Sequence, residues 1–563
     1  MSPETRRTIM RHAVAVDLVV TASGISLVFP DSPAVTFFAF VAAVAISAWL
    51  RDDEAGLAAT AYSVVTLAVF FREQIDVTTL TAFAATGAAV SAFSRAARRV
   101  RQQDHTPERA AEAEAAAASP ASTVPLPIGI PLLVIILYAD VSDSLMTQFP
   151  LPSLLRPIIL LLAIVAFKYR RIAQPMNVAL QLPVIFLVLY AITGYATGVW
   201  AHNLRAVDGR FSEFVKATFI CVLAASLIVS WQALRRALVA LIVTAAFMSA
   251  ISIVQVTTGM LENFLGGMVA VQSGNIYGQV TMPRASGPPV SDPNFYARIL
   301  LVGIPMAAAL AINERRRPRK IVYWLLAALI TGGTLVTYSR GAMFALFAMC
   351  GLMVLALRVR PRQIAALAVA GVIVIALLPS AMSKRFLTIE ALVSSEEQPV
   401  RVDSSVAKRK LLYGVAIRMF DEHLLGGVGA GNFGEHYDTL ANQVGMAERD
   451  WGVPGSPQFP HGLYFEIASE TGLLGLFTFL GAAFAAFLYL WGARRRLLER
   501  GETGRAAIAS GIGVALAGYL MASVFLHESH VRYFGLYVGL AVAVARLAQH
   551  GSDLSPRLHE ASA

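Results

Sequence analysis

The sequence predicts an all-α polytopic membrane protein with about 16 transmembrane helices. Of its 563 residues, 56% are hydrophobic and only 15% are charged, and the mean hydropathy is +0.62. Apolar runs of about 20 residues recur along the chain, and each is long enough to cross a bilayer. Lys and Arg cluster in every second loop between these runs, as the positive-inside rule requires of cytoplasmic loops. The net charge of +10 therefore indicates membrane topology rather than a nucleic-acid partner.

A polar linker divides the chain into two membrane modules. Residues 1–94 contain four apolar runs and are expected to form an N-terminal four-helix module. Residues 95–125 are rich in Ala, Glu and Pro and contain no span, so they are expected to be an exposed cytoplasmic connector. Basic residues on both sides of this module place its two ends in the cytoplasm. The four runs lie near 12–30, 33–50, 56–71 and 77–94.

The second module, residues 126–548, is predicted to have about 12 spans and to be followed by a cytoplasmic tail at 549–563. Two of its outward-facing loops are long, about 259–298 and about 380–461, and the second is too long for a simple connector. An amphipathic patch from Lys408 to Met419 is expected to be helical and to lie on the membrane. The runs lie near 127–140, 153–167, 178–197, 213–230, 235–258, 296–312, 320–337, 342–357, 363–379, 462–491, 505–526 and 532–548.

Neither a metal nor a cofactor is expected. Cys221 and Cys350 both lie inside apolar runs, and the chain has no Cys-x-x-Cys motif. His423 and His436 each have a neighbouring glutamate, but their spacing matches no helical zinc-ligand pair. The glycines of Gly427–Asn432 lack the strand–turn–helix context of a nucleotide-binding loop, so we expect a tight turn at a helix end.

His461 stands where the second long loop re-enters an apolar helix. At about 100° per residue, Gly472 and Gly475 return to within roughly 40° of the His461 direction, whereas Glu466 and Glu470 fall near the opposite side. Two interpretations follow. The helix face that carries His461, Gly472 and Gly475 is either a glycine packing face with an incidental interfacial histidine, or a close helix contact that presents the imidazole at the membrane surface.

Several cations lie on the side of the membrane where short loops should be poor in arginine. Outward-facing cations beside His461 would suit an anionic ligand, and arginine suits phosphate because its planar fork donates to two oxygens. Alternatively, each arginine snorkels to lipid headgroups or pairs with Glu or Asp in the long loop. The residues are Arg205, Arg210, Arg284, Arg298, Arg340 and Arg532, with Lys216 just inside the outer end of its span.

Four segments together resemble the O-antigen ligase and O-antigen polymerase superfamily of bacterial cell-surface glycan assembly. The resemblance covers roughly residues 126–548, including the large loop before the histidine. Ligases of this superfamily usually carry Asn, Ser or Gln directly after that histidine, whereas this chain has Gly462. The segments are Arg284–Gly287 with Asp292–Ala297, Tyr338–Gly341, Gly427–Phe433 after Met419–Leu425, and His461–Gly475, which fits His-x10-Gly-x-x-Gly.

The resemblance implies a metal-independent glycosyltransferase on the outer face of the bacterial cytoplasmic membrane. The donor would be a glycan on undecaprenyl pyrophosphate, and the acceptor a hydroxyl of a glycan, lipid or protein. The other partner would be the bilayer itself, and contact with other glycan-assembly proteins stays open. A histidine suits the task of general base near neutral pH, and fixed arginines would stabilise the departing pyrophosphate.

Within that resemblance, His461 is expected to act as the base, with Arg284 and Arg340 as pyrophosphate ligands. Further substrate-binding candidates are Arg210, Lys216, Asp292, Asn294 and Arg532. Helix capping explains the Asp292-Pro293-Asn294 turn equally well. Ligase and polymerase are not distinguished by sequence. A transporter or flippase for a glycolipid or small anion, or a non-catalytic envelope-assembly scaffold, remains an alternative.

Overall fold

A computed structural model describes parts of 131–137 and residues 155–168, 175–258, 263–264, 269–276, 280–287, 292–357, 404–443, 459–526 and 532–549. The chain divides into two units, Met1–Thr123 and Val124–Ala563, and every described residue belongs to the second. The predicted N-terminal module, the linker and the run at 363–379 lie outside the described residues, so these predictions stay untested.

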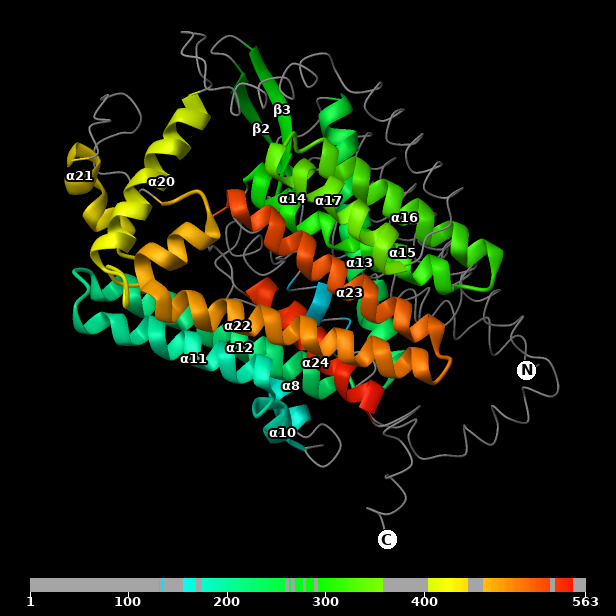
Figure 1. Cartoon of the computed structure of the whole chain (residues 1–563). Helices are drawn as coiled ribbons and strands as arrows, with labels where there is room; N and C mark the ends of the chain where they lie inside the picture. The colour runs from blue at the N-terminus through cyan, green and yellow to red at the C-terminus, as the bar shows by residue number, and fades with distance from the viewer. Residues whose placement is uncertain are drawn as a thin grey trace, which may run out of the picture. The chain divides into compact units, whose positions relative to one another are not determined.

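The described part of the chain is mostly helical (Figure 1). Within it, five segments are long and apolar enough to cross a membrane: Leu182–Val199, Trp231–Thr258, Pro293–Asn313, Leu463–Glu499 and Thr503–Phe525. A polytopic membrane protein is therefore supported, while the total of about 16 spans stays a prediction. The α-helices are α8 (Leu155–Lys168), α10 (Pro175–Ala179), α11 (Leu182–Ala196), α12 (Leu204–Leu227), α13 (Trp231–Thr258), α14 (Pro293–Leu301), α15 (Gly303–Asn313), α16 (Arg317–Leu335), α17 (Arg340–Leu357), α20 (Ser404–Glu422), α21 (Phe433–Gln443), α22 (Leu463–Glu499), α23 (Thr503–Ala522) and α24 (Arg532–Gln549), with the 3-10 helices η2 (Thr197–Val199) and η5 (Ser523–Phe525).

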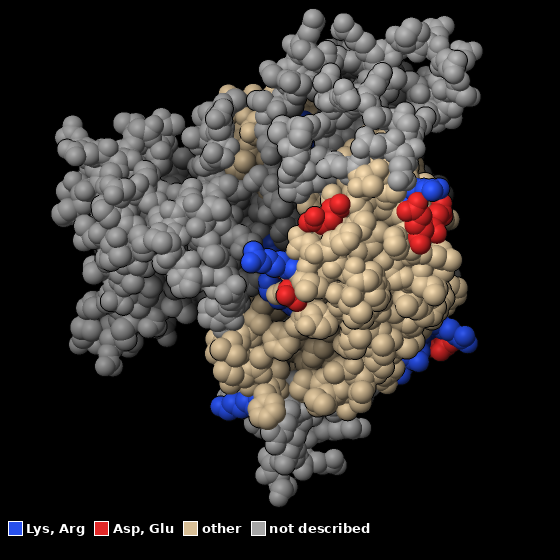
Figure 2. Space-filling model, turned by 90° about the vertical axis from the view of Figure 1, so that its left-hand side faces the viewer, with Lys and Arg blue, Asp and Glu red and all other residues tan. Residues whose placement is uncertain are grey.

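Helix α24 forms the centre of the described bundle. It packs against α12 and α22, and all of its residues from Arg532 to Ala548 are buried. A side chain at Gly535 would clash with the backbone carbonyl of Ala217 on α12. Small residues of this kind let membrane helices approach backbone to backbone. On the face shown in Figure 2, the described residues are mainly uncharged, and their Lys, Arg, Asp and Glu side chains form small groups.

The all-α prediction missed a small sheet in the first long loop. Strands β1 (Asn263–Phe264), β2 (Val269–Ile276) and β3 (Val280–Ser286) form an antiparallel sheet in the order β1-β2-β3. In its register Gln272 pairs with Arg284. The Ala285 amide also donates to the Val336 carbonyl at 3.0 Å, so the sheet is fixed to the end of α16. The strands are short and carry Gly, Ser and Gln, which gives little apolar periodicity to detect.

Arg205 and Arg210 lie inside a helix rather than in a loop, which corrects the sequence interpretation. Helix α12 begins at Leu204, with Asn203 as its N-cap, so Arg205 and Arg210 occupy its first two turns. Arg298 lies in α14 and is almost fully buried. The predicted span missed the start of α12 because its first turns are polar and only its later turns are apolar.

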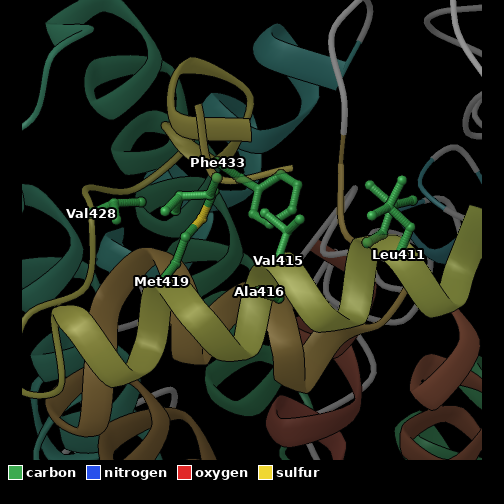
Figure 3. Packing of buried hydrophobic residues seen from close by; sticks show 8 residues of the cluster. Leu411, Val415, Ala416, Met419, Val428 and Phe433 are labelled. Carbon is green, nitrogen blue, oxygen red and sulfur yellow. The ribbon is translucent and has the colours of Figure 1, made fainter. Parts of the chain in front are cut away.

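The second long loop contains a helical cap with its own hydrophobic core. Helix α20 covers the amphipathic patch and confirms that it is helical. Its buried face carries Leu411, Val415 and Met419, which pack against Phe433 at the start of α21 (Figure 3). Helix α20 also packs on α22. The cap is therefore anchored beside the helix that follows His461.

Candidate functional site

The short helix η5 is the point where the segments that carry two predicted site residues, His461 and Arg340, meet. A Cβ atom placed on Gly462, next to His461, would lie 2.9 Å from the Val524 carbonyl oxygen. A Cβ atom on Gly341, next to Arg340, would lie 2.9 Å from the Phe525 ring. His461 and Arg340 are 121 positions apart in the sequence. The glycine that follows each of them lies close to η5, at Val524 and at Phe525 respectively.

Arg298, which lies in α14, contacts the same helix η5. Its Nη1 donates to the Ser523 hydroxyl at 3.1 Å. Its guanidinium also lies over the rings of Phe295 and Tyr519, at 4.9 Å and 4.8 Å from their centroids. A buried arginine with aromatic partners gains cation–π stabilisation. We therefore read Arg298 as a buried support for η5.

Arg284 lies against the segment that leads into Arg340. Its Nε donates to the Thr337 carbonyl at 3.0 Å, and its Nη2 donates to Asn294 Oδ1 at 3.4 Å. Tyr338 adopts a φ of 51°, a left-handed conformation that non-glycine residues rarely occupy. Such strained turns often occur at functional sites. The structure thus brings Arg284 and Asn294 next to the turn that presents Arg340.

His461 precedes the helix that it was expected to head. Gly462 is the N-cap of α22, and the Glu466 amide donates to the Gly462 carbonyl at 3.0 Å. The Tyr413 hydroxyl of α20 donates to the His461 carbonyl at 3.0 Å. Burial raises the pKa of Tyr413, so this hydroxyl keeps its proton and remains a donor. The cap helix therefore fixes the backbone of His461.

Helix α22 is not straight, which corrects the interpretation of one continuous helix face. Gly472 has φ 63° and ψ −161° inside the helix, so the helical phase is interrupted there. A side chain at Gly472 would clash with the Leu425 carbonyl, and the Leu473 amide donates to the Leu424 carbonyl at 2.8 Å. The close backbone approach expected at this glycine is present, but its partner is the loop after α20.

Glu466 and Glu470 are the residues that the sequence interpretation missed. Glu466 is fully buried and forms an ion pair with Arg210 of α12. Glu470 accepts hydrogen bonds from the Gly431 amide at 2.6 Å and the Phe433 amide at 3.4 Å. Carboxylates within an apolar span are expensive and usually have partners. In the sequence, this cost was the signal that Glu466 and Glu470 must have partners.

The glycine-rich loop is a tight turn, as predicted. Its amides face α22: Val428 donates to the Ser469 carbonyl and Gly429 to the Glu470 carbonyl, both at 2.9 Å. On its other side, Trp200 Nε1 donates to the Gly427 carbonyl at 2.9 Å. The loop therefore joins the segment that precedes α12 to the bend of α22.

The remaining predicted residues have contacts within or next to their own helices. Lys216 is half exposed and pairs with Glu213 on its own helix. Asp292 caps α14, because its Oδ1 accepts from the amides of Asn294 and Phe295. Arg532 is buried at the start of α24, over the Tyr533 ring. The preceding residues 527–531 lie outside the described part.

Three histidines gather beside the glycine-rich loop. The rings of His202 and His436 are stacked with centroids 4.6 Å apart, and His423 meets His436 edge-on at 6.5 Å. His436 Nδ1 lies 3.2 Å from the Asn432 carbonyl. Burial lowers the pKa of His436, and its two neighbouring histidines lower it further. Among the described residues, no group of three His, Cys, Asp or Glu side chains is arranged to hold a metal ion.

Comparison with known families gives a match to part of the chain. Residues 325–480 match the O-antigen ligase family. A search of curated proteins gave no match to this chain. The matched range runs from within α16 into α22, and it includes Arg340, the glycine-rich loop and His461, whereas Arg210 and Arg284 precede it. The chain therefore carries an O-antigen ligase family domain over residues 325–480.

Proposed function

We propose that this protein is a glycosyltransferase that moves a glycan from undecaprenyl pyrophosphate to an acceptor hydroxyl at the outer face of the cytoplasmic membrane. An O-antigen ligase family domain implies lipid-linked glycan substrates. The product is either a longer lipid-linked glycan (polymerase) or a glycan joined to a lipid or protein (ligase). The observation that carries the proposal is the meeting of the His461 and Arg340 segments at η5.

In the proposed reaction, the acceptor oxygen attacks the anomeric carbon while its proton passes to the His461 imidazole. The bond between the anomeric carbon and the phosphate oxygen breaks, and the electron pair leaves with undecaprenyl pyrophosphate. A histidine with a pKa near 6.5 is suited to accept the proton at neutral pH. Negative charge increases on the pyrophosphate as the bond breaks, and Arg284 and Arg340 would stabilise it.

The local structure around the two arginines supports their proposed role. The Thr337 carbonyl and the Asn294 side-chain oxygen accept hydrogen bonds from Arg284 and orient its guanidinium. Arg340 begins α17, where the Ser339 hydroxyl accepts from the Ala342 amide at 3.3 Å. Groups held in advance of the reaction stabilise a developing charge without reorganisation.

The test is the size distribution of lipid-linked and surface glycan in cells that lack the protein, complemented with wild type or His461→Ala. Loss of long chains, with single repeats still on the lipid, would identify a polymerase. Long chains that persist on the lipid, with the final acceptor bare, would identify a ligase. His461→Ala should reproduce the deletion profile while the protein is present at the wild-type level.

A different outcome would change the proposal. If the deletion leaves the profile unchanged, the protein is a transporter or a scaffold rather than the transferase. If His461→Ala restores normal glycan, His461 is not the base. Membrane levels of the variant, measured on the same cells, separate lost chemistry from lost protein.

A further inference from the structure

Arg298 is a charged residue buried inside a candidate membrane span. It lies in the span Pro293–Asn313 and is only 1% exposed. Ionisable residues inside a membrane span are costly and are by default candidates for a functional role. Because Arg298 is closed off from its surroundings, any such role must act through the residues that it contacts rather than on a substrate directly.

The contacts of Arg298 hold the junction between α23 and η5. Its Nη1 donates to the Ser523 hydroxyl at 3.1 Å, and that hydroxyl donates to the Tyr519 carbonyl at 2.7 Å. The Arg298 guanidinium also lies 4.8 Å from the centroid of the Tyr519 ring. The hydroxyl therefore serves as both acceptor and donor, and the arginine contacts η5 and the last turn of α23 together.

The junction in turn supports the helices next to the proposed site. The Tyr464 hydroxyl of α22 donates to the Leu520 carbonyl of α23 at 3.0 Å. The Phe525 ring of η5 meets the Phe344 ring of α17 edge-on, with centroids 6.1 Å apart. Both contacts lie within the first two turns of α22 and α17. The proposed base stands just before α22, and one proposed pyrophosphate ligand begins α17, so a shift of the junction would displace both.

Helix α14 connects this junction with the other proposed pyrophosphate ligand. Asn294 Oδ1 accepts from Arg284 Nη2 at 3.4 Å. Asn294 and Arg298 are four positions apart in α14, so they lie on about the same face of the helix. The helix packs against β3, which carries Arg284, and against α23 (Figure 1). One helix therefore contacts both Arg284 and the residues that lead into η5.

We propose that Arg298 is a positioning residue, which holds η5 against α14 and so aligns the proposed base with the two proposed pyrophosphate ligands. The proposal rests on the proposed function. An arginine suits this task because its planar guanidinium donates hydrogen bonds at its edge while its face lies over an aromatic ring. Misplacement of reacting groups by about 1 Å can lower a rate about 100-fold, even when the change is remote from the chemistry.

The test separates alignment from folding and from substrate binding. The full-length protein is purified into nanodiscs, and kcat and KM are measured for glycan transfer. The donor is lipid-linked glycan purified from cells that lack the protein. The acceptor is the same glycan or, for a ligase, membranes of cells that make no donor. Thermal unfolding measures the folded fraction of each variant.

The variants remove the contact from either side. They are Arg298→Met, Arg298→Lys, Ser523→Ala and the double variant Arg298→Met/Ser523→Ala. Arg546→Met is the matched control, because Arg546 is also buried, at 6% exposed, and donates to the Ala225 carbonyl at 2.7 Å. It lies at the predicted cytoplasmic end of α24, so its loss tests what the removal of a buried arginine does by itself.

Arg298→Met should lower kcat about 100-fold and leave KM within about threefold of wild type. Arg298→Lys, which keeps a donor, should recover part of this loss. Ser523→Ala should lower kcat as well, and the double variant should lose little more than Arg298→Met, because both changes remove the same contact. Arg546→Met should keep the wild-type kcat per folded protein.

The proposal is overturned if Arg298→Met keeps the wild-type kcat, if its loss lies in KM, or if the losses of the two single variants multiply in the double variant. An equal loss of kcat in Arg546→Met would also overturn it. If Arg298→Met does not fold, Arg298→Lys and Ser523→Ala decide by the same criteria. Absence of transfer by wild type would refute the proposed function and this proposal with it, whereas the other outcomes leave the proposed function intact.

Discussion

Arg284 and Arg210 are oriented by different kinds of partner. Arg284 donates to a backbone carbonyl and a side-chain amide, whereas Arg210 forms an ion pair with the fully buried Glu466. At the residue scale, the ion pair lets Arg210 hold α12 and α22 together, and the two acceptors of Arg284 fix the direction of its guanidinium beside the turn at Tyr338.

The first prediction concerns the guanidinium group. Arg340→Lys should lower the rate of glycan transfer about 100-fold, because an ammonium cannot donate to two phosphate oxygens in a fixed plane. Transfer is measured with purified protein and a lipid-linked donor. Arg495→Lys is the control, since Arg495 is an exposed partner of Glu499 and its replacement should leave the rate unchanged. Full activity of Arg340→Lys would limit Arg340 to a structural or topological role.

The second prediction concerns the ion pair between α12 and α22. Glu466→Ala should destabilise the protein by about 3–5 kcal/mol, because it leaves the Arg210 charge poorly compensated in a mostly buried site. The double variant Arg210→Met/Glu466→Met should recover most of that loss, since an apolar pair has no charge to desolvate. Thermal unfolding measures both. A double variant no more stable than Glu466→Ala would show that the pair has a role that apolar packing cannot replace.

At this scale the sequence singled out motif residues whose roles stay predictions, and it missed the distant partners of Glu466 and Glu470. The predicted positions of His461, Arg284 and Arg340 depended on local sequence and a family resemblance. The roles of Glu466 and Glu470 depend on Arg210 and Gly431, which are 256 and 39 positions away. No local pattern contains such a pairing. Only the cost of an unpaired carboxylate in an apolar span indicated that partners must exist.

At the element scale, the bend in α22 creates the contact between the helix and the loop after α20. The third prediction is that Gly472→Ala destabilises the protein by at least about 2 kcal/mol, because its φ/ψ combination is nearly restricted to glycine and a side chain there would strike the Leu425 carbonyl. Gly492→Ala is the control on the same helix, since nothing lies within 4 Å of its Cβ position. That variant should be neutral or about 0.5–1 kcal/mol more stable. Equal unfolding temperatures for the two variants would contradict a required bend.

The histidine cluster gives the fourth prediction. The pKa of His436 is below its ordinary value of 6.5 in the folded protein, chiefly through burial. Between that lowered pKa and about 6.5, the unfolded chain binds more protons, so stability falls as the pH drops through this window. Thermal unfolding should show a smaller loss between pH 7.5 and 5.5 for His436→Asn than for wild type. Thr439→Asn, at an exposed position of the same helix, should retain the wild-type pH dependence. If His436→Asn loses as much stability as wild type between pH 7.5 and 5.5, the histidine cluster does not cause this pH dependence.

Elements were predictable where apolar periodicity was strong. Helices α13, α16 and α24 agree closely with the expected spans, because each is a long apolar run bounded by polar residues. The start of α12 and the three-stranded sheet were missed. The first turns of α12 are polar and are held by contacts with the glycine-rich loop, and the sheet is fixed by a backbone bond to Val336. Both depend on distant partners rather than on local pattern.

At the scale of the whole molecule, orientation decides whether the proposed chemistry faces the correct side. The alternation of basic loops predicts that the segment with α20 and α21 is outside and that the loop between α22 and α23 is inside. Cysteine substitution in a C221A/C350A background tests this with a membrane-impermeant maleimide. Thr439→Cys, exposed on α21, should react in intact spheroplasts. Arg495→Cys, whose native side chain is 76% exposed, should react only after the membrane is permeabilised. The reverse pattern would place His461 in the cytoplasm, where a donor presented on the outer face could not reach it.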